Sequence, residues 1–89
     1  MRLQIYSRKE CHLCDEAKAD VYKVIAGFPV TVEEIDIDSD PDALRAYQYE
    51  IPVIVLDGRK LFKYRVDKRK LRKAIQQRIK SEGGRDNPA

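Results

Sequence analysis

The sequence has no tryptophan, a single histidine and only two cysteines among its 89 residues. It also lacks any apolar run near the roughly 20 residues that span a bilayer, and its first residues contain no apolar stretch long enough for a secretory signal. These absences argue against a membrane partner and lead us to expect a cytoplasmic location. In a reducing compartment, two cysteines are redox or metal-binding groups more often than a structural staple.

Length and composition predict one small domain. A chain of 89 residues supports a single core, and 43% hydrophobic with 37% charged residues is typical of a folded α/β protein rather than a disordered one. Because no repeat or linker is present, we assign residues 1–82 to one domain. Gly83 and Gly84 are expected to end the last helix, which makes residues 83–89 a flexible tail.

The net charge of +3 is unevenly distributed. Residues 33–42 contain six acids and no base, whereas residues 63–80 contain nine bases and one acid. Two solvated surfaces of opposite sign are the interpretation that we favour. The alternative is a basic face for an acidic partner or nucleic acid. Nucleic acid is disfavoured as a partner because the basic run has few aromatic side chains.

Hydrophobic periodicity predicts seven elements in the order β-α-β-α-β-β-α. We expect helices at residues 11–26, 41–47 and 68–82, and strands at residues 2–6, 30–37, 51–56 and around Leu61, Phe62 and Tyr64. Pro41 suits the first position of a helix, Asp67 is a candidate N-cap, and Asp57-Gly58 is a hairpin signal. The predicted fold class is α/β, with a four-stranded mixed sheet and three helices on its two faces.

Cys11 and Cys14 stand three residues apart, where the first strand gives way to a helix. At a helix start, backbone N–H groups and the macrodipole favour a thiolate, which lowers a thiol pKa from about 8.5 by one to several units. Cys14 falls one turn inside the helix on its apolar face beside Asp15, so burial and charge favour its thiol form. We therefore predict that Cys11 is a nucleophile and Cys14 a resolving thiol. Inert core cysteines would not require this spacing.

Two neighbouring side chains are candidate modulators of Cys11. Arg8 brings positive charge close to the helix start, which favours the thiolate. A charged His12 would do the same and would make the oxidised pair easier to reduce. The alternative for His12 is an exposed polar side chain with little effect, and the sequence does not separate the two.

Residues 6–14 and 51–53 resemble the glutaredoxins within the thioredoxin superfamily, in particular the short bacterial glutaredoxin-like proteins with Cys-His-Leu-Cys. The resemblance covers roughly residues 2–80. It implies a thioredoxin-like fold and a thiol–disulfide oxidoreductase that needs no cofactor and acts on a disulfide-containing protein or a low-molecular-weight thiol. It also implies a cis peptide bond before Pro52. The backbone of Ile51 would then face Cys11 and receive an extended substrate.

One part of the glutaredoxin pattern is missing. Glutaredoxins carry a Gly-Gly turn and an acid after the fourth strand that help to hold glutathione. Here the corresponding residues are Tyr64 and Arg65, and Asp67 is the remaining acid. The resemblance therefore implies substrate-binding roles for Ile51, Pro52, Tyr64 and Asp67. Glutathione is a candidate co-substrate that we expect to be handled poorly.

Two alternatives remain for the function. The first is a metal- or iron–sulfur-binding module that uses Cys11, His12 and Cys14. A closed zinc site needs four ligands, and the chain has no other cysteine or histidine, so we expect a metal-free monomer. The second is a binding adaptor that uses the basic C-terminal helix without any catalysis.

Overall fold

The computed structural model describes the backbone of residues 1–86 and the side chains of residues 1–81. Its elements are β1 (Arg2–Ser7), α1 (His12–Ile25), β2 (Thr31–Asp36), the 3-10 helix η1 (Ile37–Ser39), α2 (Pro41–Tyr47), β3 (Val53–Leu56), β4 (Arg59–Lys63) and α3 (Lys68–Asp86). This order confirms the predicted β-α-β-α-β-β-α. The added turn η1 forms where the Asp36 carboxylate accepts a hydrogen bond from the N–H of Asp38 at 2.9 Å.

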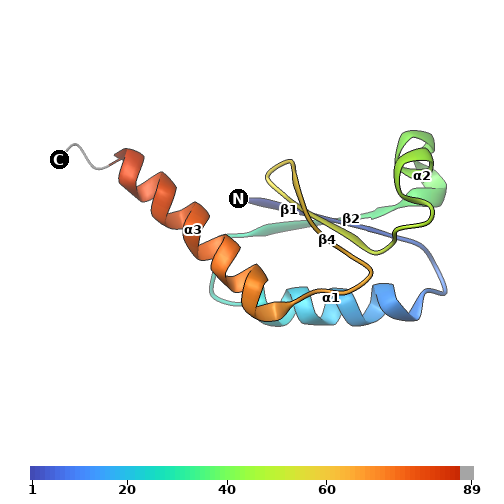
Figure 1. The fold of residues 1–89 in the computed structure, drawn as a ribbon, viewed down its shortest axis with the longest axis horizontal. Coiled ribbons are helices and arrows are strands. Elements are labelled where there is room, and N and C mark those ends of the chain that lie inside the picture. The colour runs from blue at the N-terminus through green and yellow to red at the C-terminus, as the bar shows by residue number, and fades with distance from the viewer. Residues whose placement is uncertain (87–89) are drawn as a thin grey trace.

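The four strands form one mixed sheet in the order β2-β1-β3-β4 (Figure 1). Strand β1 is parallel to β2 and antiparallel to β3, and β3 is antiparallel to β4. The parallel pair needs the crossover through α1, whereas β3 and β4 are joined by a two-residue turn. In that turn Asp57 and Gly58 have φ of 47° and 84°, the left-handed values that a tight hairpin requires.

The hydrophobic core lies between one face of the sheet and the helices α1 and α3. Strands β1 and β3 and both helices supply its buried residues, which are Leu3, Ile5, Val21, Val24, Ile54, Leu56, Leu71 and Ile75. On the other face, α2 covers one end of the sheet, where the rings of Tyr6 and Tyr47 lie 4.7 Å apart. Helices therefore lie on both faces, as predicted, but the second face is only partly covered (Figure 1).

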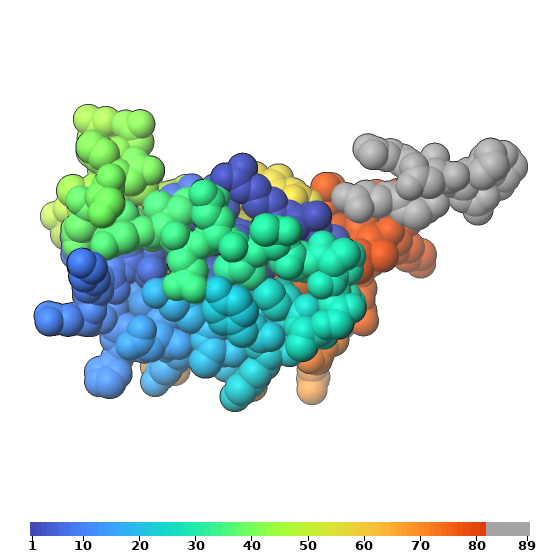
Figure 2. All heavy atoms as spheres, turned by 180° about the vertical axis from the view of Figure 1, so that it is seen from behind, coloured from blue at the N-terminus to red at the C-terminus, as the bar shows by residue number. Residues whose placement is uncertain are grey.

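Helix α2 begins as the sequence predicts. The Asp40 carboxylate accepts hydrogen bonds from the N–H groups of Asp42 and Ala43 at 3.1 and 3.2 Å, and Pro41 occupies the first turn. Figure 2 shows α2 standing at the same end of the molecule as the start of α1, whereas α3 lies at the opposite end. No helix in the described part of the chain is long and apolar enough to cross a membrane.

Two predicted boundaries are wrong. Helix α3 continues through Gly83 and Gly84 to Asp86. Glycine weakens a helix but retains its backbone N–H donor, so the helix propagates where proline would stop it. Strand β4 ends at Lys63, and Tyr64 lies beyond it with a φ of 69°. The last part of the proposed tail, residues 87–89, lies outside the described residues.

The attachment of α3 to the core depends on two fully buried side chains, Leu71 and Ile75. We predict that Ile75→Ala lowers the free energy of unfolding by about 2–5 kcal/mol, because it leaves a cavity under the helix. The matched control is Gln76→Ala on the exposed side of the same helix, which should change stability by less than about 0.5 kcal/mol. Urea unfolding measures both, and equal effects would contradict this packing.

Candidate functional site

The two cysteines form a disulfide at the amino end of α1. Cys11 is the N-cap residue, with an extended backbone (φ −123°), and its Cα lies 5.2 Å from that of Cys14. The N–H of Cys14 donates a hydrogen bond to Sγ of Cys11 at 3.2 Å. Sγ of Cys11 therefore occupies the place where a capping oxygen accepts the first free N–H groups of a helix.

The two sulfur-bearing residues differ sharply in exposure. Cys14 is fully buried, on the side of α1 that faces the core, whereas Cys11 is half-buried at the surface. An incoming molecule therefore has access to Cys11 first. This geometry supports the proposed division of labour between the cysteines, although their catalytic roles remain a prediction.

His12 lies exposed in the first turn of α1. It lines a shallow hollow of about 220 Å³ together with Glu10, Cys11 and Asp15, so two carboxylates share its surroundings. The amino-acid pattern does not mark Glu10 as a functional residue. The structure places it directly before Cys11 in the left-handed region, with a φ of 54°, a conformation that its residue type does not signal.

Arg8 is held by an acidic side chain. Its guanidinium contacts the Asp38 carboxylate at 2.8 Å through Nη2 and at 2.9 Å through Nε. Hydrogen bonding from Arg8 keeps the pKa of Asp38 below its ordinary value. Any effect of Arg8 on Cys11 must therefore act with Asp38 as its closest counter-charge, which reduces the positive field at the sulfur.

The peptide bond between Ile51 and Pro52 is cis, as the resemblance predicted. Pro52 is buried, and Val53 beyond it pairs with Tyr6 of β1. Since β1 leads through Ser7 and three further residues to Cys11, the start of β3 and the cysteine pair lie at the same end of the sheet. Ile51 itself stays outside the β3 ladder and is half-buried.

Tyr64 connects the chain after β4 to the segment before β3. Its backbone N–H donates to the Pro52 carbonyl at 2.9 Å, and its phenol donates to the Tyr49 carbonyl at 3.1 Å. A further hydrogen bond, from the N–H of Arg65 to the Lys63 carbonyl at 2.8 Å, closes a γ-turn around Tyr64. Turns of this kind with positive φ are rare and strained. Tyr64 therefore holds both ends of residues 49–52.

The same tyrosine approaches the redox motif. Tyr64 and its neighbours Arg65 and Val66 line a hollow of about 160 Å³ together with four residues of α1, which are Leu13, Glu16, Ala17 and Asp20. Leu13 stands between the two cysteines in sequence. The structure thus brings Tyr64 close to Leu13 of the motif, and its role in substrate binding stays a prediction.

Asp67 is the N-cap residue of α3. Its carboxylate accepts a hydrogen bond from the N–H of Lys70 at 3.0 Å, which caps the start of α3 as predicted. It is not among the residues that line the hollow beside Leu13. A carboxylate already used as an N-cap is less available to bind the amino group of a ligand.

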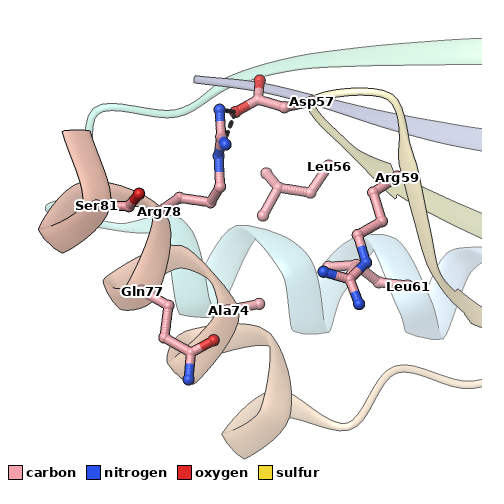
Figure 3. Close-up of a pocket in the computed structure, with 8 residues that line it drawn as sticks. All are labelled: Leu56, Asp57, Arg59, Leu61, Ala74, Gln77, Arg78 and Ser81. Atoms are coloured by element: carbon pink, nitrogen blue, oxygen red, sulfur yellow. Dashed lines mark hydrogen bonds and ion pairs between the residues drawn. The ribbon is translucent and has the colours of Figure 1, made fainter. Parts of the chain in front are cut away.

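A separate hollow of about 190 Å³ lies between the β3–β4 hairpin and α3 (Figure 3). Leu56, Leu61 and Ala74 form its apolar part, and Arg78 is paired with Asp57 at its edge. The N–H of Asp57 donates to the carbonyl of Arg2 at the start of β1. The cysteines follow the other end of β1, so this hollow is remote from the redox pair.

The described residues contain no group of three or more histidine, cysteine, aspartate or glutamate side chains arranged to hold a metal ion. Cys11, His12 and Cys14 are therefore not joined by a nearby carboxylate into a site of that size. The arrangement instead defines a class of protein. It is a four-stranded mixed sheet with a disulfide-forming Cys-x-x-Cys pair at the first helix and a cis-proline opposite, which is the thioredoxin-like fold.

The chain belongs to the family described as Glutaredoxin-like domain (DUF836), whose model matches residues 2–76. A curated relative, the glutaredoxin-like protein YDR286C homolog of Dictyostelium discoideum, is 32% identical over 92 residues, which cover 92% of this chain and 85% of the relative. Family and disulfide together support a redox-type role.

Solved structures agree with the fold. Protein XcR50 from X. campestris has 32% identity and a TM-score of 0.70, with 84% of this chain and 96% of that chain covered. Protein Ne2328 from Nitrosomonas europaea has 26% identity and a TM-score of 0.72, with 83% and 89% covered. Mitochondrial thioredoxin 3 from Saccharomyces cerevisiae has 23% identity and a TM-score of 0.65. The match covers 85% of this chain and 76% of the thioredoxin, which shares the fold.

The capping role of Asp67 is open to a direct test. We predict that Asp67→Ala lowers the free energy of unfolding by about 1 kcal/mol, whereas Asp67→Ser, which keeps a capping oxygen, loses much less. Thermal or urea unfolding measures the difference. A binding role without a capping role would be indicated if both variants kept wild-type stability and lost activity equally.

Proposed function

We propose that this protein is a thiol–disulfide oxidoreductase that exchanges disulfides through Cys11 and Cys14. The observation that carries the proposal is the pairing of a half-buried Cys11 at a helix start with a fully buried Cys14 one turn later. The helix start favours the thiolate of Cys11, and burial favours the neutral thiol of Cys14. The glutaredoxin-like family supports the same chemistry.

The proposed reaction begins with the reduced pair. The Cys11 thiolate attacks one sulfur of a substrate disulfide, so a mixed disulfide forms and the other substrate sulfur leaves as a thiolate. Cys14 then gives its proton to that first substrate thiolate and attacks Sγ of Cys11, which breaks the mixed disulfide. The Cys11–Cys14 disulfide forms, and the second substrate sulfur leaves as a thiolate that takes a proton from water. The substrate has then gained two electrons and two protons, one of them from Cys14 and one from solvent. A dithiol protein or two molecules of a monothiol restore the reduced pair.

The exchange runs through the two sulfur atoms, so the proposal includes no resident metal or cofactor. A monomer is sufficient, because both cysteines, the Ile51–Pro52 segment and Tyr64 come from one chain. We propose a protein disulfide as the main substrate and a cytoplasmic location, in line with the composition of the chain.

The first test concerns the asymmetry of the cysteines. We predict that Cys14→Ser traps a mixed disulfide on Cys11, whereas Cys11→Ser abolishes exchange, because only Cys11 is accessible to a substrate. Mass spectrometry after incubation with a disulfide substrate detects the trapped species. Alkylation of the reduced protein near neutral pH provides the control, and faster labelling of Cys14 than of Cys11 would show that the roles are reversed.

Glutathione is the natural competitor for a protein substrate, and the geometry around Tyr64 disfavours it. An ordinary glutathione site needs close approach to the backbone after the fourth strand. Here that backbone forms a γ-turn centred on Tyr64, a residue that is 44% exposed, and the ammonium of Lys63 lies 5.6 Å from the centre of its ring. The only acid in the segment, Asp67, caps α3. Losing one charge-assisted hydrogen bond costs about 1.5–3 kcal/mol, or roughly ten- to a hundredfold in binding.

We therefore predict that Tyr64→Gly/Arg65→Gly speeds the reduction of a glutathione mixed disulfide by about tenfold or more relative to a protein disulfide. Glycine tolerates the positive φ at residue 64, so the fold should persist, and thermal unfolding checks this. Tyr64→Phe is the matched control because it keeps the ring and removes only the hydroxyl. Glutathione turnover as fast as in a typical dithiol glutaredoxin, and unchanged by the two glycines, would rule out this steric explanation.

A further inference from the structure

Helix α3 presents an unusual charge distribution to solvent. From Lys68 to Ser81 it contains seven cations and no acid. Its core side is fixed by Leu71 and Ile75, which are fully buried. At 100° per residue, Arg69, Lys73, Gln76 and Lys80 lie on the side opposite those two residues, Arg72 lies at the border of that side, and all five are exposed. We call these five residues the α3 stripe.

Within residues 1–81, the stripe gathers cations without an ion pair on one face of a helix. Single exposed cations elsewhere, such as Lys23 and Arg59, make no ion pair either, whereas Arg2 is paired with Glu33, Arg8 with Asp38 and Lys18 with Glu34. On α3 itself, Lys68 contacts Asp20 at 3.8 Å and Arg78 contacts Asp57 at 3.0 Å. Within residues 1–81, the four cations of the stripe make no ion pair, so their field extends into solvent.

This arrangement acts against helix stability. Arg69 lies three and four residues before Arg72 and Lys73, and like charges at those spacings repel one another on a helix surface. Nothing in the packing of α3 requires cations there, since the core contacts come from the other side of the helix. A cluster of like charges on one face creates a positive potential that attracts partners of opposite charge.

The stripe begins at the end of α3 that is nearer to the cysteines, where Lys68 contacts Asp20 about two turns of α1 after Leu13. Asp67 caps the helix, and the three residues before it line the hollow that contains Leu13 of the Cys-His-Leu-Cys motif. From there α3 runs away from the amino end of α1 (Figure 1). A macromolecule seated on the first turns of the stripe therefore reaches the cysteines across Tyr64 and Leu13.

The surroundings favour an acidic protein over a nucleic acid. Glu16 and Asp20 line the hollow between the stripe and the cysteines, and Glu10 and Asp15 flank Cys11. A uniform polyanion that continued from the stripe toward Cys11 would meet these carboxylates. The stripe also has no aromatic side chain on which bases could stack. A protein that carries an acidic patch beside a non-acidic disulfide fits both regions.

We propose that the α3 stripe is a docking surface for acidic protein partners of the redox pair. The proposal rests on the proposed exchange activity and specifies in addition that the substrate protein is acidic. Docking brings an acidic protein to the surface beside Cys11 and raises the encounter rate, while the chemical steps remain those of the cysteine pair. Small neutral disulfides gain nothing from it.

The test compares Arg69→Glu/Lys73→Glu with a control, Lys23→Glu/Arg59→Glu, which makes the same change in net charge at exposed positions away from the stripe. Reduction of insulin, an acidic protein with disulfides, should slow by about tenfold or more at low salt in the stripe variant only. The difference should disappear near roughly 0.5 M salt. Bis(2-hydroxyethyl) disulfide, which is small and neutral, should be reduced at the same rate by all three proteins.

Equal loss in both double variants, or no loss in either, would overturn the docking surface. Failure of every protein to reduce the neutral disulfide would overturn the exchange activity instead. In that event, binding of a labelled oligoglutamate peptide, followed by fluorescence anisotropy, decides the docking surface alone, and loss of binding in the stripe variant supports it. Binding of duplex DNA through the stripe, with insulin reduction unaffected by Arg69→Glu/Lys73→Glu, would assign the surface to nucleic acid.

Discussion

The position of β1 inside the sheet is the constraint on which the redox site depends. β1 hydrogen-bonds to β2 on one side and to β3 on the other, and it buries Leu3 and Ile5 against α1 and α3. Burial of each side chain contributes about 1.5–3 kcal/mol. The chain that leaves β1 at Ser7 therefore starts from a fixed point and delivers Cys11 to the edge where β3 begins. Strand pairing thus brings the cysteines and the cis-proline segment to the same end of the sheet.

Tyr64 provides a second connection to the segment before β3, in addition to strand pairing. The positive φ of this γ-turn costs on the order of 1–3 kcal/mol for a residue other than glycine. Two hydrogen bonds to the carbonyls of Tyr49 and Pro52 offset that cost and tie the end of β4 to residues 49–52. Where a glycine turn would leave this segment free on one side and open to a small ligand, the tyrosine restrains it and fills the space. One residue thus joins the turn after β4 to the segment that contains the cis-proline.

Much of this fold was predictable because local signals and tertiary structure agree. Several signals act within a few residues, and the structure contains each of them. They are the alternation in β1, the continuous apolar run of β3, the Asp40 and Asp67 caps and the Asp57-Gly58 turn. The cysteine pair was predictable for the same reason, since its spacing and its place at a helix start are local. The conformation of Tyr64 was not, because it depends on carbonyls 12 and 15 residues earlier in the chain. The ion pair between Arg8 and Asp38 joins residues 30 positions apart, so it could not be predicted from local sequence either.

The sequence also does not reveal which charged side chains the fold pairs with one another. The acids of residues 33–42 and the bases of residues 63–80 look like equivalent charged runs in the sequence. In the structure, three of these acids accept hydrogen bonds. Asp40 caps α2, Asp36 accepts from the N–H of Asp38 at the start of η1, and Asp38 accepts from the guanidinium of Arg8. The bases on the outer side of α3 have no such structural use within the described side chains. The external field is therefore set by which charges the fold leaves unpaired, and a modest net charge of +3 conceals a strongly cationic helix at the edge of a largely self-neutralised surface.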